Sequence, residues 1–257
     1  MIDKYKIKIV ITLLIFFTLV TTHTHADILE ARNAYKEFRS ALAKAQDLDS
    51  QGHSEQAEKQ RNDSLALLAK TRALFEAANA LVSSDYDVLI EYAEVLNWSG
   101  DSDLAAEALN RATELKPSDS RAWLALGRIL TDLGPAKRND ARKALEKAIS
   151  VADSLDVETE ARLVLAVFYW DLGLYNECRA QCSLIRERKP DHISCRIVMT
   201  ALDTREGLLK EASDELDSIG NLNIGQTLLL NKVLPKALDD FELSRKTIPD
   251  EAEYHVA

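Results

Sequence analysis

Apolar residues between Leu89 and Pro117 recur three or four positions apart on each side of a polar turn, Trp98-Ser99-Gly100-Asp101. This spacing places them on one face of a helix, so the stretch predicts two short amphipathic helices joined by the turn. Ala93 and Ala105 are small enough to lie where two helices approach closely. Pro117 has no backbone N–H and therefore ends the second helix. The stretch predicts an antiparallel helix pair.

The spacing of this helix pair recurs through residues 85–249. Each second helix carries a small residue, and a further core residue follows four positions later. Successive units are 36, 37, 34 and 25 residues apart, as counted between the small residues Ala105, Ala141, Cys178, Ala212 and Ala237. Repetition at such a period is typical of a solenoid, and we expect five repeats. Because the last offset is short, we expect a truncated first helix after Gly220-Asn221-Leu222-Asn223.

The repeats resemble the tetratricopeptide repeat family, whose pattern places Trp, Leu-Gly and Tyr on the first helix and Ala, Phe and Pro on the second. The second repeat matches as Trp123, Leu126-Gly127, Leu130, Ala141 and Leu145, whereas Arg162 and Arg196 stand at the usual Trp position of later repeats. The resemblance covers about 165 residues. It implies an all-α fold, a right-handed superhelical solenoid of antiparallel helix pairs, with a concave face built from the first helices.

Residues 27–84 follow a different pattern and predict a helical hairpin of their own. Ala31, Tyr35, Phe38 and Leu42 lie on one helical stripe, which Asp49-Ser50-Gln51-Gly52 interrupts before a second helix. The hairpin is interpreted as a cap on one end of the solenoid, because terminal repeats depart from the consensus. A protruding arm that makes coiled-coil contacts is the alternative. Residues 250–257 are expected to form a C-terminal tail.

The first 26 residues have the pattern of a secretory signal peptide: a basic head, an apolar run over residues 9–20 and small residues before Asp27. The apolar run is shorter than the roughly 20 residues that span a bilayer as a helix. We expect cleavage after Ala26 and an extracytoplasmic protein, most readily in a bacterial periplasm. The alternative is an uncleaved anchor to the inner membrane over residues 9–22, the one case in which a membrane would be a partner.

The composition and charge of the sequence argue against several classes of protein function. The formal net charge is −10, with 8 Gly and 5 Pro in 257 residues, which favours a helical, acidic body and argues against nucleic acid as a partner. The five histidines are scattered, and no phosphate-binding loop or nucleophile elbow is present in the sequence. We therefore expect neither an enzyme nor a bound metal or cofactor.

Three cysteines leave two interpretations open. Cys178 and Cys182 lie one helical turn apart at core positions of the repeat, so buried small apolar side chains are the first interpretation. In an oxidising compartment a disulfide becomes plausible, and Cys182 with Cys195 is the pair we then expect.

The family resemblance implies a binding groove on the concave face, built from first-helix positions outside the packing stripe. The groove residues that it predicts are Ile90, Glu94, Asn97, Trp98, Arg121, Leu124, Arg128, Leu163, Val167 and Trp170. An apolar floor with Trp and Arg anchors suits a peptide or an amphipathic helix of a partner protein. The alternative is that the floor is filled by the protein's own N-terminal hairpin or packs locally.

These features predict an exported scaffold or adaptor within an envelope assembly or secretion machine. Two alternatives stay open: a structural module that self-associates through the N-terminal hairpin into a homo-oligomer, and a protein that resembles the periplasmic repeat subunits of cytochrome c maturation.

Overall fold

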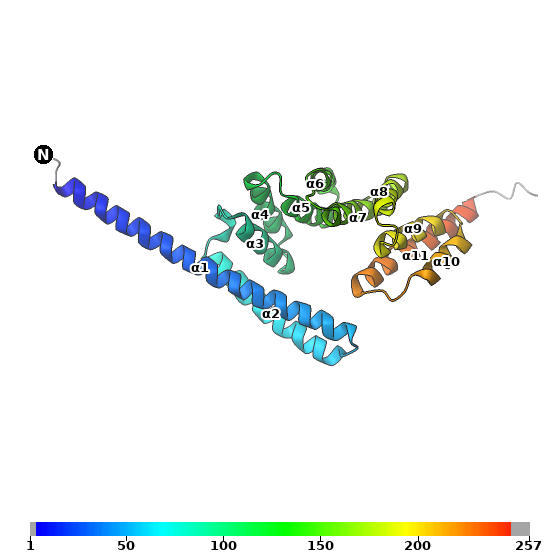
Figure 1. Cartoon of the computed structure of the whole chain (residues 1–257), viewed down its shortest axis with the longest axis horizontal. Coiled ribbons are helices and arrows are strands. Elements are labelled where there is room, and N and C mark those ends of the chain that lie inside the picture. The colour runs from blue at the N-terminus through cyan, green and yellow to red at the C-terminus, as the bar shows by residue number, and fades with distance from the viewer. Residues whose placement is uncertain (1–3, 248–257) are drawn as a thin grey trace, which may run out of the picture. The chain divides into compact units, whose positions relative to one another are not determined.

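The computed structural model describes the backbone of residues 4–247 and the side chains of residues 27–223 and 225–245. Within that part of the chain all regular structure is helical, with eleven α-helices and two short 3₁₀ helices, and no strand forms (Figure 1). The predicted all-α fold is confirmed. The chain divides into two compact units, Met1–Ala141 and Arg142–Ala257, and each is described separately below.

The first unit begins with a hairpin of two long helices, α1 (Lys4–Ser50) and α2 (Ser54–Ala77), which lie side by side (Figure 1). The turn between them contains Gly52, which adopts a positive φ of 79°. Small side chains line their contact and let the helix axes approach closely. The buried alanines of this contact are Ala31, Ala34, Ala41, Ala45 and Ala57. Phe38 and Phe75 supply the large buried side chains of the hairpin.

The segment with the signal-peptide pattern forms the N-terminal part of α1, which continues past the end of α2 as a single helix (Figure 1). In the described part of the chain, no helix combines the length and apolar character needed to cross a membrane. Cleavage after Ala26 and the extracytoplasmic location stay predictions.

A helix pair, α3 (Tyr86–Trp98) and α4 (Ser102–Leu115), follows the short helix η1 (Ala80–Val82). The Asp85 carboxylate caps α3 by accepting hydrogen bonds from the N–H groups of Asp87 and Val88. Ala93 and Ala105 are buried together with Leu89, Leu96 and Leu109. The helix pair predicted from the hydrophobic spacing therefore forms. The unit continues with α5 (Ser120–Asp132) and η2 (Pro135–Lys137).

The second unit contains most of α6 (Arg138–Ser150), then α7 (Leu155–Asp171), α8 (Tyr175–Arg188), α9 (Ile193–Arg205) and α10 (Leu209–Ser218). Its last helix is α11 (Ile224–Thr247). The core is shared by α7, α8, α9 and α11. Its fully buried members include Trp170, Cys182, Ile197, Val233 and Ala237.

The predicted fifth repeat is wrong, because residues 224–247 form one continuous helix rather than a helix pair. Turns inside the four preceding pairs contain Gly100, Gly134, Gly173 and Gly207, each with a positive φ between 73° and 90°. Glycine adopts this conformation without the steric strain of a side chain. Residues 226–240 contain no glycine, so the backbone has no comparable place to reverse. Pro235 lies inside α11 and removes only one backbone hydrogen-bond donor.

Candidate functional site

A pocket of about 320 Å³ opens on the first unit where α1, α3, α4 and α5 meet. Its floor is apolar, and two guanidinium groups, a carboxylate and an amide lie around it. The lining residues are Arg39, Ile90, Ala93, Glu94, Asn97, Leu109, Ala125, Arg128 and Ile129. The pocket therefore combines aliphatic contact surface with charged groups of both signs.

Four predicted groove residues line this pocket: Ile90, Glu94 and Asn97 on α3, and Arg128 on α5. Asn97 is exposed, and its Oδ1 accepts a hydrogen bond of 3.1 Å from the Ser102 hydroxyl. The repeat pattern also brings Ala125 and Ile129 to the pocket through the neighbouring turns of α5. Neither of these two is among the predicted groove residues.

The other three predicted residues of the first unit lie outside the pocket lining. Leu124 is only 8% exposed and belongs to the core, which corrects its assignment to an open groove floor. Trp98 is 50% exposed, and its ring lies edge-on to Phe38 of α1 with the ring centroids 6.3 Å apart. Arg121 forms ion pairs with Asp119 and Asp87, at 2.8 and 3.2 Å.

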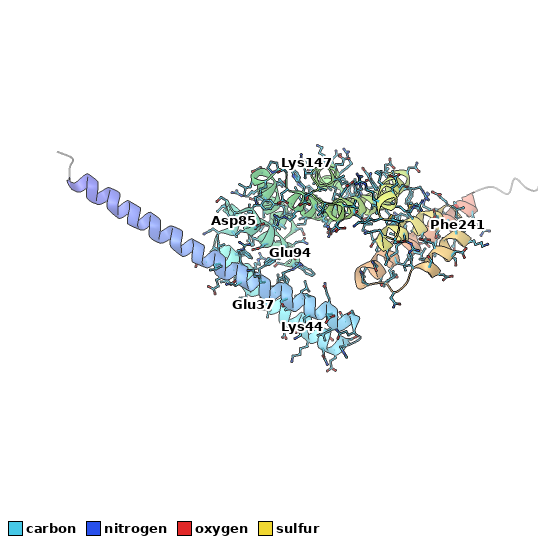
Figure 2. All side chains as sticks on the ribbon, in the orientation of Figure 1. Glu37, Lys44, Asp85, Glu94, Lys147 and Phe241 are labelled. Carbon is cyan, nitrogen blue, oxygen red and sulfur yellow. The ribbon has the colours of Figure 1, made fainter. Side chains whose placement is uncertain are left out.

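The hairpin covers part of the face of α3 that we predicted to be free for a ligand. Arg32 binds Glu91 through Nε and Nη2, at 2.9 and 2.8 Å. The Tyr35 hydroxyl donates a hydrogen bond of 2.5 Å to the Glu94 carboxylate, and Arg39 forms an ion pair with the same carboxylate. Figure 2 labels Glu94 on α3. The N-terminal hairpin thus fills part of this face, and Arg39 becomes a pocket residue that lies 55 positions before Glu94.

Burial and hydrogen bonds to carboxylates keep the donors of this contact, Tyr35 and Arg32, protonated. Burial of the Tyr35 ring, and its hydrogen bond to Glu94, raise the pKa of the phenol well above its usual range. The hydrogen bond to Glu91 raises the pKa of Arg32. The phenol and the guanidinium therefore keep their protons through the physiological pH range, and both remain donors to the carboxylates of α3.

A second charged cluster fixes the start of α5. The Asp119 carboxylate accepts a hydrogen bond of 3.0 Å from the Arg121 backbone N–H, so it caps the helix. The side-chain hydrogen bond from Arg121, and then the hydrogen bonds from the Arg121 backbone N–H and from Tyr86, lower the pKa of Asp119 to about 2. The Tyr86 hydroxyl also accepts from the Ala122 N–H at 3.3 Å.

Replacing Asp119 with Asn should reveal a charge-dependent contribution to stability. Because the pKa of Asp119 is lower in the folded protein than in the unfolded chain, its ionised form stabilises the fold above about pH 4, and this contribution disappears as the pH falls towards about 2. Arg121 is largely solvent-exposed, so screening limits the loss in Asp119→Asn to about 1 kcal/mol at pH 7. Urea unfolding of both chains and a carboxyl NMR titration measure it. A pH-independent difference would contradict this account.

The predicted groove residues of the second unit are buried or partly buried in its core. Leu163 and Val167 are partly buried and pack against the core that contains Val233 and Ala237 of α11. Trp170 is fully buried, so its assignment as an exposed groove anchor is wrong. Lys236 of α11 lies over its ring, with Nζ 5.7 Å from the ring centroid. The physical reason is that α11 packs against α9 and that its Lys232 and Lys236 contact the end of α7, where an open groove would leave space.

The disulfide that the sequence left possible between Cys182 and Cys195 does not form in the structure, where all three thiols are free and buried, as the first interpretation has it. The Cys195 thiol instead donates to the Cys182 carbonyl oxygen, with Sγ 3.2 Å from it. Hydrogen bonds with the thiols of Cys178 and Cys195, together with burial, raise the pKa of Cys182. In the part of the chain that the structure describes, no His, Cys, Asp or Glu side chains gather into a group that could hold a metal ion.

Comparison with known proteins supports the repeat fold. Residues 86–129, which span α3, α4 and most of α5, match the family model described as "Tetratricopeptide repeat". The crystal structure of MamA is similar at 17% sequence identity and a TM-score of 0.50, covering 73% of this chain and 96% of MamA. PilF of Pseudomonas aeruginosa is similar at 18% identity and a TM-score of 0.50, covering 88% of this chain and 96% of PilF. The search of curated proteins found no match. Residues 86–129 thus match a tetratricopeptide repeat, and the chain has the helical fold of tetratricopeptide-repeat solenoids.

Proposed function

We propose that this protein is a scaffold or adaptor that holds a short segment of a partner protein in the pocket of its first unit. The observation that carries the proposal is the composition of that pocket, an aliphatic floor between α3 and α5 with Arg39 and Arg128 at its lining. A volume of about 320 Å³ accommodates one or two side chains of a bound segment rather than a whole helix.

The chemistry of the lining suggests what the segment contains. Burying one aliphatic side chain against Ile90 and Ile129 contributes about 1.5–3 kcal/mol. A hydrogen bond between the Arg128 guanidinium and a carboxylate contributes about 1.5–3 kcal/mol more. Immobilising the segment offsets much of this gain, so we expect affinities on the order of micromolar. The proposed ligand is a peptide with an aliphatic residue next to Asp, Glu or a C-terminal carboxylate.

Arg128→Glu should weaken the binding of such peptides at least about tenfold, because it places a carboxylate beside the ligand's own. Peptides are selected from a displayed random library on residues 27–257, and the affinity of each is then measured by fluorescence anisotropy. Arg138→Glu is the matched control, since Arg138 is exposed and lies outside the pocket lining. The proposal fails if selected peptides lack the aliphatic–acidic pattern, or if both variants bind them equally.

Export is a separate part of the proposal and rests on the signal-peptide pattern of residues 1–26. It would make the partner a protein of an envelope assembly or secretion machine. The chain isolated from its natural source should begin at Asp27 when its N-terminus is sequenced. An N-terminus at Met1 would contradict cleavage, and recovery in the membrane fraction would then favour the anchor over residues 9–22.

A further inference from the structure

We propose that the second unit contains a helix-binding surface that α11 occupies in the same chain, and that a partner helix with the charge pattern of α11 replaces it there. This surface, the α11 seat, consists of Trp170 and Asp171 at the end of α7, Tyr175 on α8, Arg205 at the end of α9, and Gly207 in the turn after α9. The inference goes beyond the pocket of the first unit, because its residues and its ligand are different.

Two lysines of α11, one helical turn apart, bind the end of α7. Lys232 pairs with the Asp171 carboxylate, with Nζ and Oδ2 2.7 Å apart. Lys236 donates to the Trp170 backbone carbonyl oxygen over 3.2 Å. The Trp170 carbonyl oxygen also accepts a hydrogen bond of 3.0 Å from the Gly173 N–H, and cations are favoured near the C-terminus of a helix. The end of α7 therefore selects a basic helix face.

One turn further along α11, the charge reverses. Asp240 accepts a hydrogen bond of 2.6 Å from the Tyr175 hydroxyl and one of 3.2 Å from Arg205 Nε. The Arg205 guanidinium also lies 3.9 Å from the centre of the Tyr175 ring. The seat thus recognises Lys, Lys and Asp at positions i, i+4 and i+8, which lie on one face of a helix.

An aromatic side chain of α11 also contacts the seat. Phe241, labelled on α11 in Figure 2, lies against Gly207. A Cβ atom at Gly207 would lie 3.0 Å from the Phe241 ring, so the absence of a side chain there makes room for the ring. The seat is therefore shaped for an aromatic residue next to the acidic one.

The contacts of α11 suit a helix that can leave. The side chains of the Lys232–Asp171 pair are 48% and 37% exposed, and ion pairs in contact with solvent hold weakly. Only Val233 and Ala237 of its described side chains are fully buried, and both are small. Pro235 removes a hydrogen-bond donor from the middle of the helix. Residues 220–223, which connect α11 to α10, belong to no helix.

A buried donor in the seat gives a competing helix an advantage. Trp170 is fully buried, and its indole Nε1 has no hydrogen-bond acceptor among the described residues. Leaving a buried donor unpaired is unfavourable. A partner helix that carries the Lys–Lys–Asp pattern and also brings a side-chain oxygen to this nitrogen would bind more favourably than α11.

Displacement is tested by adding a labelled peptide of residues 224–247 to the full chain of residues 27–257 and measuring anisotropy. Lys236→Glu in the protein weakens its own α11 but leaves the seat unchanged, so the peptide should bind this variant at least tenfold more tightly than the wild type. Lys210→Glu, at an exposed position of α10, makes the same charge change away from the seat and should behave as the wild type. A peptide carrying Lys236→Glu should not bind.

Equal binding to Lys236→Glu, Lys210→Glu and wild-type chains would overturn the proposal. Hydrogen exchange on the wild-type chain gives a test that needs no variant: amides around Val233 in α11 should exchange at least tenfold faster than those around Ile197 in α9. Equal protection of the two helices would also overturn it. If the wild-type chain forms a dimer that the peptide dissolves, the occupant is a second copy of this chain, and the partner helix is excluded.

Discussion

Trp170→Ala should lower the free energy of unfolding of the second unit by about 3–5 kcal/mol. Trp170 is the largest fully buried side chain of the described residues, and its ring contacts Tyr175 edge-on with the centroids 5.2 Å apart. Its removal leaves a cavity between α7, α8 and α11 that the neighbouring side chains fill only partly. The loss in the free energy of unfolding is measured by urea titration and, separately, by hydrogen exchange of amides in α7 and α9.

Trp170→Phe is the matched control for this prediction. It keeps an aromatic ring in the core and removes the unpaired indole N–H, so the loss should be clearly smaller than for Ala. A loss below about 1 kcal/mol in Trp170→Ala would mean that the side chain is not a core residue. Equal losses in both variants would mean that the indole itself, rather than the volume it fills, stabilises the unit.

Ala125→Phe should abolish peptide binding to the first unit, with an affinity loss of at least about hundredfold under the proposed function. Ala125 lines the pocket on α5 and is only partly buried, so a ring at this position can enter the space that the ligand would use. Losing the burial of one aliphatic side chain and one charged hydrogen bond together accounts for a change of this size.

Stability distinguishes a blocked pocket from a damaged fold. Ala125→Phe should change the free energy of unfolding of the first unit by no more than about 1 kcal/mol, because the ring fills open space rather than packed core. Ala125→Ser leaves the pocket open and should bind as the wild type. Undiminished binding by Ala125→Phe would place the ligand somewhere other than this pocket.

Much of the candidate site was predictable from local spacing. Ile90, Glu94 and Asn97 lie on α3 at positions three or four residues apart, and Arg128 follows the same rule on α5. Arg39 could not be predicted in this way, because it reaches the pocket through the packing of α1 on α3. Nothing in the spacing of one helix specifies which distant helix will cover it.

The last helix shows where periodicity becomes ambiguous. Gly225 and Ala237 are 12 residues apart, like the small residues Ala93 and Ala105 of the first helix pair, and a continuous helix satisfies that separation equally well. A turn glycine distinguishes the two structures, and the first four pairs each have one. Residues 226–240 contain none, so the sequence did contain the information that α11 is a single helix.

The sequence by itself determined the helices, the turns between paired helices and most of the buried positions, because these depend on a 3.6-residue period and on residues that start or end a helix. Only the tertiary structure decided which inner faces remain open. Trp170 and Glu94 have the spacing of groove residues, yet α11 buries the first and α1 binds the second. The reason is that a solenoid face is complementary to any suitable helix, and the helices that cover it can come from the same chain at a distance of 55 to 66 residues.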